Sequence, residues 1–521
     1  MSRTMPGALD LPSFLSLDGV KIWLEQQVWG HRFYNDQTPW LMLLEAIGLM
    51  AFRATDSNGG NRIFEPHTGE HENFRYEMRR GSSLRYLLFA DRNIDEIANS
   101  QSVAEAGMWA RWFSSLGPQG ETNFGYLRQR FATFGSFRNA VALLRDSETE
   151  PNRRRRLTSR HLAPRGPEML FADFGEGRKK VDAVNKDRRF FARGGELLFL
   201  MLNRSASAAQ IEPLLKDRIL SVDSRWTLLA ERLTSPKPEN PVTFENIGYL
   251  PLATHRTYEV LGEDWLALLS LKSLPDDNLS EPLMRLSGLA VVRYMVERSA
   301  EVLGQGAPPM PIDMMAPNTA GLRKLSQDSY ALHRDMSRKA IERVIDDFVA
   351  SDEWKQACSR PGPNKAVGEL VKSRFAFDPE EPEKGDVERM PDTLKEAARS
   401  VHDMHLGSVL GFYAEQIGLA ASRHGASRWY AMSDGLLEAL VMSNVREPME
   451  FEVFLAKLDA RYGFVIGSEV ARQRYASVND EHVKENQRHL ENRLRMLGLL
   501  KRLSDDVAFV LNPFWKDEVS A

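Results

Sequence analysis

The sequence has very little cysteine, since Cys358 is the only one among its 521 residues. A single cysteine cannot form an intramolecular disulfide, and it cannot supply a cysteine-rich zinc or iron–sulfur site. Long apolar runs are also missing, because about eighteen consecutive apolar residues occur nowhere in the chain. The sequence therefore predicts neither a secretory signal nor a membrane span, and we expect a cytoplasmic protein.

The chain also lacks net positive charge. It carries 68 Lys and Arg against 72 Asp and Glu, a formal charge of −4. Any contact with nucleic acid must then come from a local basic patch rather than from the overall field. The composition is otherwise ordinary for a globular protein, with 42% apolar and 27% charged residues, and the length allows several domains.

The commonest catalytic motifs are absent. The sequence contains no Gly-x-x-x-x-Gly-Lys-Ser/Thr loop, no Gly-x-Ser-x-Gly elbow, no His-Glu-x-x-His and no dinucleotide fingerprint after a strand. These patterns carry the chemistry of NTPases, serine hydrolases, zinc proteases and dehydrogenases. The sequence therefore favours a non-enzymatic protein without a cofactor, although it leaves the question of catalysis open.

One weak metal pattern remains. His402 and His405 are three residues apart, so they share one face of an expected helix, and Glu415 or His424 could complete a ligand set. The spacing matches no metal motif, and histidines on amphipathic helices are usually surface or capped residues. No metal is expected, and a divergent metal-dependent nuclease stays as one alternative.

Helical periodicity dominates most of the chain. Apolar residues recur three and four positions apart, and Pro, Gly, Asn and Asp interrupt the pattern. Helices are expected over residues 23–29, 40–52, 84–97, 196–203, 211–220, 226–233, 258–271, 283–303, 321–355, 392–424 and 434–445. The predicted fold class is mainly α, with a multi-helical body.

The charge changes sign between residues 150 and 195. Thirteen Arg or Lys face six acidic residues there, a local charge of 13 − 6 = +7. Guanidinium groups bind phosphates through bidentate hydrogen bonds and release condensed counterions. The candidate DNA-binding residues are Arg153, Arg154, Arg155, Arg156, Arg160, Arg188, Arg189 and Arg193. Nearby aromatic side chains, among them His161 and Phe171, could stack on bases. An acidic protein partner or a solvated interdomain loop are the alternatives.

The glycines that follow Arg193 give this stretch a second interpretation. Free N–H groups at a helix N-terminus can hold a phosphate. Gly194 and Gly195 lack the spacing of a phosphate loop, so a simple helix start is the favoured interpretation.

The clearest pattern lies at the C-terminal end. A first helix from Pro448 should stop at Gly463, which is suited to a left-handed cap. A second helix over 468–475 should be capped by Ser468. A third helix over 480–497 should bury Val483, Leu490, Leu494 and Leu497 and stop at Gly498.

Two short strands, 499–503 and 507–511, should follow as a hairpin. Three helices and a hairpin resemble a winged helix-turn-helix over residues 448–515. The expected fold is thus a multi-helical body with a C-terminal winged-helix domain carrying a small β-hairpin.

The resemblance implies a surface that can contact DNA. Residue types that contact phosphates and base edges lie opposite the apolar stripe and on the wing strand. They are Lys484, Arg488, Asn492, Arg495, Lys501 and Arg502. Glu481, Glu485 and Glu491 share much of this face, so protein docking and packing against the rest of the chain stay open.

Composition shifts and breaks divide the chain into six regions. They are an N-terminal helical domain (1–145), a basic Arg-rich loop region (146–195), a central helical domain (196–358), a Pro/Gly/acidic linker (359–391), a helical segment (392–447) and the winged helix-turn-helix (448–515).

A large helical body that lacks enzyme motifs and ends in a winged helix resembles accessory proteins of bacterial phage-defence systems. That resemblance implies a non-enzymatic DNA-binding or adaptor subunit of a multi-protein complex, with antiviral defence as its role. DNA and other protein subunits are the expected partners, and no membrane is involved. A scaffold that docks an ATPase or nuclease partner is the main alternative.

Overall fold

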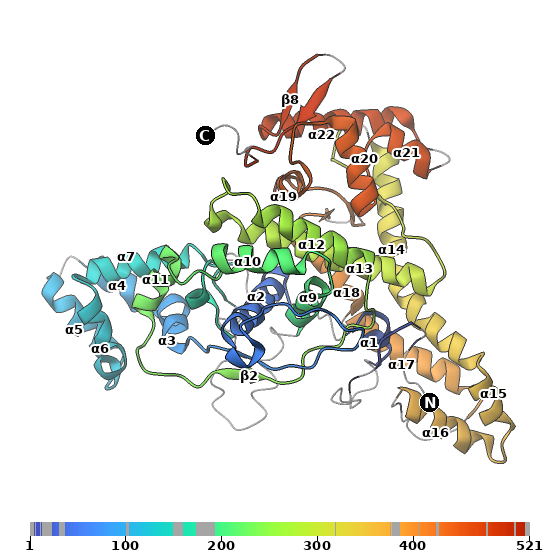
Figure 1. Cartoon of the computed structure of the whole chain (residues 1–521), viewed down its shortest axis with the longest axis horizontal. Helices are drawn as coiled ribbons and strands as arrows, with labels where there is room; N and C mark the ends of the chain where they lie inside the picture. Colours follow the sequence, from blue (N-terminus) through green and yellow to red (C-terminus); the bar gives the residue numbers. More distant parts are fainter. Residues whose placement is uncertain are drawn as a thin grey trace.

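The computed structural model describes residues 5, 7–10, 12, 23–30, 37–100, 104–149, 160–172, 193–317, 319–375, 377, 386–404, 406–423, 427–475, 478–504 and 507–515. Within these residues the protein is mainly α with small sheets, as the sequence predicted. Figure 1 shows a long helical body with α5 and α6 at one end, and a group of C-terminal helices with a projecting hairpin on one side. Among the described helices, none has the length and apolar composition needed to cross a bilayer.

The centre of the main core is a pair of buried helices from distant parts of the sequence. α2 (Pro39–Thr55) begins where the Thr38 side chain accepts a hydrogen bond from the Leu41 N–H. α9 (Gly194–Asn203) packs along α2, and every residue of α9 is buried. The short α1 (Trp23–Trp29) joins the same core.

A second core lies in an N-terminal helical bundle. Its helices are α3 (Ser82–Arg85), the π-helical turn Tyr86–Ala90, α4 (Asn93–Ala98), α5 (Glu105–Ser115), α6 (Gly120–Arg130) and α7 (Phe134–Arg145). Trp109, Trp112 and Phe137 pack together at its centre. α11 (Arg225–Leu233) and the 3-10 turn Pro167–Met169 complete the bundle, so this core draws on residues from both sides of position 145.

The rest of the body is helical as well. Its helices are α10 (Ala208–Arg218), α12 (Arg256–Leu269), α13 (Ser280–Val302), α14 (Ala320–Val349), α15 (Asp352–Ser359), α16 (Pro363–Phe375), α17 (Met390–Met404), α18 (Leu406–Ile417) and α19 (Asp434–Asn444), with 3-10 turns Ser57–Gly59 and Asp276–Asn278. α13 is buried along most of its length. α14 is the longest of the described helices, and it runs from the C-terminal helices down to α15 and α16 (Figure 1).

Part of the predicted linker is a packed helix. α16 lies inside residues 359–391, and its Val367, Val371 and Phe375 are buried in the main core. The interpretation of this part as an exposed linker is wrong. Proline is tolerated in the first turn of a helix, so Pro363 starts α16 instead of breaking it.

The strands are short and tie distant segments together. β1 (Tyr76–Met78) pairs antiparallel with β2 (Val242–Phe244), β4 (Ala420–Ala421) pairs antiparallel with β5 (Trp429–Tyr430), and β3 (Met310–Pro311) pairs parallel with β7 (Phe464–Val465). A three-stranded sheet has the order β6 (Met449–Glu450), β9 (Ala508–Val510), β8 (Leu500–Arg502). β3–β7 therefore joins the body to the C-terminal helices.

Candidate nucleic-acid interface

The C-terminal module, residues 449–515, contains α20 (Phe451–Tyr462), α21 (Ser468–Arg474), α22 (Asp480–Met496) and the β8–β9 hairpin. α20 ends at Gly463, which has a φ of 69°. α22 begins at Asn479, whose side-chain oxygen accepts the N–H groups of Glu481 and His482 at 3.0 and 3.2 Å. Three helices and a hairpin thus occur in the predicted order.

The start of α21 differs from the prediction. Its N-cap is Gly467, without a side-chain cap, and the hydroxyl of Ser468 is buried with no hydrogen-bond partner among the described residues. The backbone N–H of Ser468 donates instead to Oε1 of Gln487 at 3.1 Å. The prediction that Ser468 caps α21 is therefore wrong. The side chain of Gln487, on α22, accepts a hydrogen bond from the first turn of α21 instead.

The inner face of α22 is buried and carries one polar residue. Val483, Leu490 and Leu494 are buried, as the periodicity predicted, while Leu497 is half-buried. Asn486 lies between them and is fully buried. Its Oδ1 accepts the Met314 N–H at 2.7 Å, and its Nδ2 donates to the Ile312 carbonyl at 3.0 Å.

Asn486 was not among the residues predicted from the sequence. A signal for it was present, because Asn486 follows Val483 by three positions and precedes Leu490 by four, which puts it on the apolar stripe.

The outer face of α22 carries the predicted contact residues. All four side chains are exposed: Lys484, Arg488, Asn492 and Arg495. Two of them form ion pairs along the helix, Lys484 with Asp480 at 2.8 Å and Arg488 with Glu485 at 3.3 Å. Exposed pairs of this kind contribute about 1 kcal/mol or less, so either cation can exchange its carboxylate for a phosphate.

The hairpin adds two exposed cations to this end of the module. Leu500 faces inward, while Lys501 and Arg502 are exposed. The Arg502 guanidinium lies 3.6 Å from the carboxylate of Glu491 on α22. Figure 1 shows the hairpin projecting away from the helical body, beside α22. The structure thus brings the six predicted residues of this module onto α22 and the adjacent hairpin.

Several polar contacts hold the module to the body. On α22, Arg493 donates to the Met432 carbonyl at 2.9 Å and pairs with Asp434 at the start of α19. On α20, the Tyr462 hydroxyl donates to the buried carboxylate of Asp264 at 2.7 Å. The Arg461 guanidinium donates to the same carboxylate at 2.8 Å. The module is therefore fixed on α12 and α19.

The Arg-rich region is placed only in part. Arg153, Arg154, Arg155, Arg156, Arg188 and Arg189 lie outside the described residues. Arg160 forms a bidentate ion pair with Glu148, with one N–O distance of 2.7 Å. The rings of His161 and Phe171 are buried and stack on each other, with centroids 5.4 Å apart. These two rings cannot stack on bases, so that part of the prediction is wrong.

Arg193 lies in a buried polar network at the start of α9. Its Nε donates to both carboxylate oxygens of Glu196 at 2.8 and 2.9 Å. The N–H of Gly194 donates to Oε1 of Gln37 at 3.1 Å, and the N–H of Gly195 donates to Oε2 of Glu45 at 2.8 Å. A helix does start at Gly194, as predicted, and side chains of Gln37 and Glu45 occupy its first N–H groups.

Glu45 is the unusual group in this network. Burial, with Glu196 nearby, raises the pKa of Glu45 to about 8, although hydrogen bonds from Gly195 and Gln37 oppose the rise. Glu45 is therefore largely protonated at neutral pH. This network could not be predicted from the sequence, because Gln37 and Glu45 lie about 150 residues before Gly194 and Gly195.

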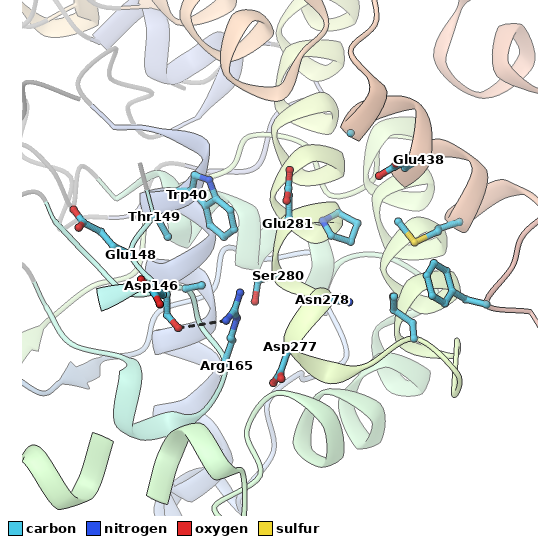
Figure 2. Close-up of a pocket in the computed structure, with 17 residues that line it drawn as sticks. Trp40, Asp146, Glu148, Thr149, Arg165, Asp277, Asn278, Ser280, Glu281 and Glu438 are labelled. Atoms are coloured by element: carbon cyan, nitrogen blue, oxygen red, sulfur yellow. Dashed lines mark hydrogen bonds between the residues drawn. The ribbon is translucent and has the colours of Figure 1, made fainter. Parts of the chain in front are cut away.

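An acidic cleft of about 400 Å³ lies between residues 146–149, residues 163–165, α13 and α19 (Figure 2). Its acidic lining residues are Asp146, Glu148, Asp277, Glu281 and Glu438. Arg165 donates to the Ser147 hydroxyl at 3.3 Å, and its guanidinium lies over the Trp226 ring. An acidic lining repels phosphate, so this cleft does not extend the basic surface.

Of the histidines in the predicted metal pattern, the structure describes His402, and its contacts are those of a buried structural residue. His402 is buried, with Nε2 3.0 Å from the Ser337 hydroxyl and Nδ1 3.3 Å from the Glu25 carboxylate. Glu415 accepts a hydrogen bond from Arg428 at 2.7 Å, whereas His405 and His424 lie outside the described residues. Among the residues that the structure places, no group of three or more His, Cys, Asp or Glu could hold a metal.

Comparison with family models gives a match over the C-terminal part of the chain. Residues 392–510 match the family model described as "Methylation-associated defense system protein MAD7". The matched range runs from α17 to β9, so it includes the exposed face of α22 and the hairpin. No curated protein and no solved structure matches significantly.

Proposed function

We propose that this chain is a DNA-contacting subunit of an anti-phage defence complex, and that its C-terminal module is a winged helix-turn-helix that carries the contact. The observation behind this proposal is the division of α22 into two faces. One face is buried against the body, and the other presents Lys484, Arg488, Asn492 and Arg495 to solvent. A helix of this kind fits the major groove, where such residues reach phosphates and base edges.

The family match supports the defence role. The matched model is described as a methylation-associated defense system protein, and it covers the whole outer face of α22. We take the methylation in this description to be methylation of DNA, so a subunit without a recognised catalytic motif would supply DNA binding or assembly. The Arg-rich segment with Arg153 to Arg156 would add phosphate contacts to the same duplex.

The test is duplex DNA binding across a salt series. Replacing Arg488, Arg495 and Lys501 by Ala should weaken binding at least about tenfold at low salt and reduce the slope of log K against log salt by up to about three. A control variant with Arg338, Lys339 and Arg343 replaced by Ala removes the same charge from the exposed side of α14. A chain that does not bind DNA at low salt would refute the proposal.

Arg153 to Arg156 need a separate variant. Replacing all four by Ala should lower affinity and salt slope in addition to the α22 change, if both regions contact one duplex. Equal salt slopes for this variant and the unmodified chain would remove the Arg-rich segment from the proposal and leave α22 as the contact.

Protein docking by the same module is the second candidate function. The module exposes several large apolar side chains, of which Met496 at 85% and Leu503 at 62% are the most exposed among its described residues. Exposed apolar groups at a module surface commonly mark a protein interface. This function predicts that a Met496→Ser, Leu503→Ser variant loses co-purifying subunits, whereas the arginine variant keeps them.

A further inference from the structure

α22 carries three amide side chains, and they are used differently. Asn486 is buried and binds the backbone of residues 312 and 314. Gln487 binds the N–H of Ser468 and pairs with Glu452 on α20. Asn492 is exposed and makes no hydrogen bond to any described residue. It is therefore the one amide of this helix whose donor and acceptor both face solvent.

Asn492 is flanked by cations on the same face. Arg488 precedes it by four residues and Arg495 follows it by three, so all three side chains lie on neighbouring turns. With a rise of about 1.5 Å per residue, the two arginines lie about 6 and 4.5 Å from Asn492 along the axis. Successive bases in one strand are about 3.4 Å apart, so each of these two distances corresponds to between one and two base steps.

Two of the three carboxylates on this face are engaged, whereas Glu481, about three turns before Asn492, is exposed and forms no ion pair with any described residue. Glu485 pairs with Arg488, and Glu491 lies next to Arg502. Neutralised in this way, they repel a duplex less than free carboxylates would. Arg495, in contrast, forms no ion pair with any described residue, and its charge is available for a phosphate next to the base that Asn492 would reach.

We infer that Asn492 reads an adenine in the major groove and that methylation of that adenine at N6 blocks the reading. This inference rests on the proposed function. An Asn amide matches adenine bidentately, because Nδ2 donates to N7 and Oδ1 accepts from the N6 amino group. Neither thymine nor cytosine presents this pair of groups, and guanine offers two acceptors instead.

In N6-methyladenine the methyl group is attached to the amino group that donates in this contact. In a duplex, one N6 hydrogen pairs with thymine, so a methyl group must take the position of the other hydrogen, on the N7 side. That second hydrogen is the one that Oδ1 of Asn492 would accept. The methyl group therefore removes the donor and fills the space of the contact, so the protein would prefer unmethylated adenine.

The test starts from the full-length protein and a pool of duplexes with a random core. Duplexes selected for binding are sequenced and remade with N6-methyladenine at one adenine at a time. We expect one adenine position at which the methyl group weakens binding by roughly 5- to 100-fold, the range of a bidentate base contact. Asn492→Ala should bind the unmethylated duplex more weakly and show no response to the methyl group at that position.

Controls separate the possible outcomes. Arg495→Ala should weaken binding to methylated and unmethylated duplexes equally, because it contacts a phosphate. If the protein binds no duplex at low salt, the proposed function fails and this inference fails with it. If it binds but shows no methyl-sensitive adenine, or if Asn492→Ala keeps the sensitivity, DNA contact stands and the inference is overturned.

Discussion

At the scale of single residues, Glu45 makes stability depend on pH. Its pKa is raised to about 8 in the folded protein from an ordinary value of 4.5. Between these values the folded chain binds one more proton than the unfolded chain, so the free energy of unfolding falls as pH rises from about 4.5 to 8. Glu45→Gln removes the titration and can still accept the hydrogen bonds from Gly195 and Gln37.

We therefore expect the Glu45→Gln variant to gain stability relative to the unmodified chain as pH rises, by an amount on the order of a few kcal/mol at pH 8. Urea unfolding at pH 5.5, 6.5, 7.5 and 8.5 measures this difference. Glu447→Gln, at an exposed position, should show no such trend. If the free energies of unfolding of Glu45→Gln and of the unmodified chain change with pH in parallel, the raised pKa of Glu45 is contradicted.

Asn486 and Asn492 form a matched pair on α22. Asn486→Ala leaves the Met314 N–H and the Ile312 carbonyl buried without their partner, and it should lower the free energy of unfolding by roughly 2–4 kcal/mol. Asn492→Ala, on the exposed side, should change it by less than about 0.5 kcal/mol. Urea or thermal unfolding of both variants makes the comparison, and equal losses would place the buried role of Asn486 in doubt.

At the level of secondary structure, replacing the residue at the start of α22 should destabilise the protein, whereas replacing the one at the start of α21 should not. Asn479→Ala removes the oxygen that accepts the Glu481 and His482 N–H groups, so it should cost about 1 kcal/mol. Asn479→Asp keeps an acceptor and should restore most of that loss. Ser468→Ala should be close to neutral, because the Ser468 hydroxyl binds none of the described residues. Hydrogen exchange at the first turns of both helices would show whether the losses are local.

Sequence periodicity was enough to predict most helices but not their interruptions. The expected helix over 321–355 is divided into α14 and α15 at Ser351, whose side chain caps α15. The expected helix over 392–424 is likewise divided into α17 and α18. Apolar spacing continues through such breaks, because both helices bury the same kind of face. α16 was missed for the opposite reason, since proline and glycine before it looked like a loop.

Polar contacts between distant segments could not be predicted at all. A buried amide such as Asn486 and an exposed one such as Asn492 have the same local preferences, and only the packing of α22 on residues 312–314 separates them. The outer face of α22 could be named from the sequence because it lies opposite an apolar stripe. His161 and Phe171 could not be placed, since their burial depends on the N-terminal bundle around them.

At the scale of the whole molecule, the C-terminal module belongs to the main core. Leu490, Leu494 and Val510 pack in the same hydrophobic cluster as α2, α9 and α13. The N-terminal bundle, in contrast, has a separate core that includes Trp109 and Trp112. A change inside that bundle can therefore loosen residues 82–145 locally, whereas a change at the base of the module affects the body as a whole.

This arrangement predicts that the module cannot be removed without damage. A chain ending at residue 447 loses β7, the partner of β3, and it leaves the buried carboxylate of Asp264 without Arg461 and Tyr462. The loss of the β3–β7 pairing and of these polar contacts, together with newly exposed apolar surface, should lower the melting temperature by several degrees and cause association. Size-exclusion chromatography with light scattering and thermal unfolding measure both effects.

The variant with Arg488, Arg495 and Lys501 replaced by Ala is the control for this truncation, because it changes only exposed side chains. It should stay monodisperse and melt within about 2 °C of the unmodified chain, since surface substitutions of this kind have small effects. A truncated chain with an unchanged melting temperature would show that the module is energetically independent. Loss of DNA binding on truncation is therefore open to two explanations, whereas the same loss in the folded surface variant identifies α22 and the hairpin as the contact.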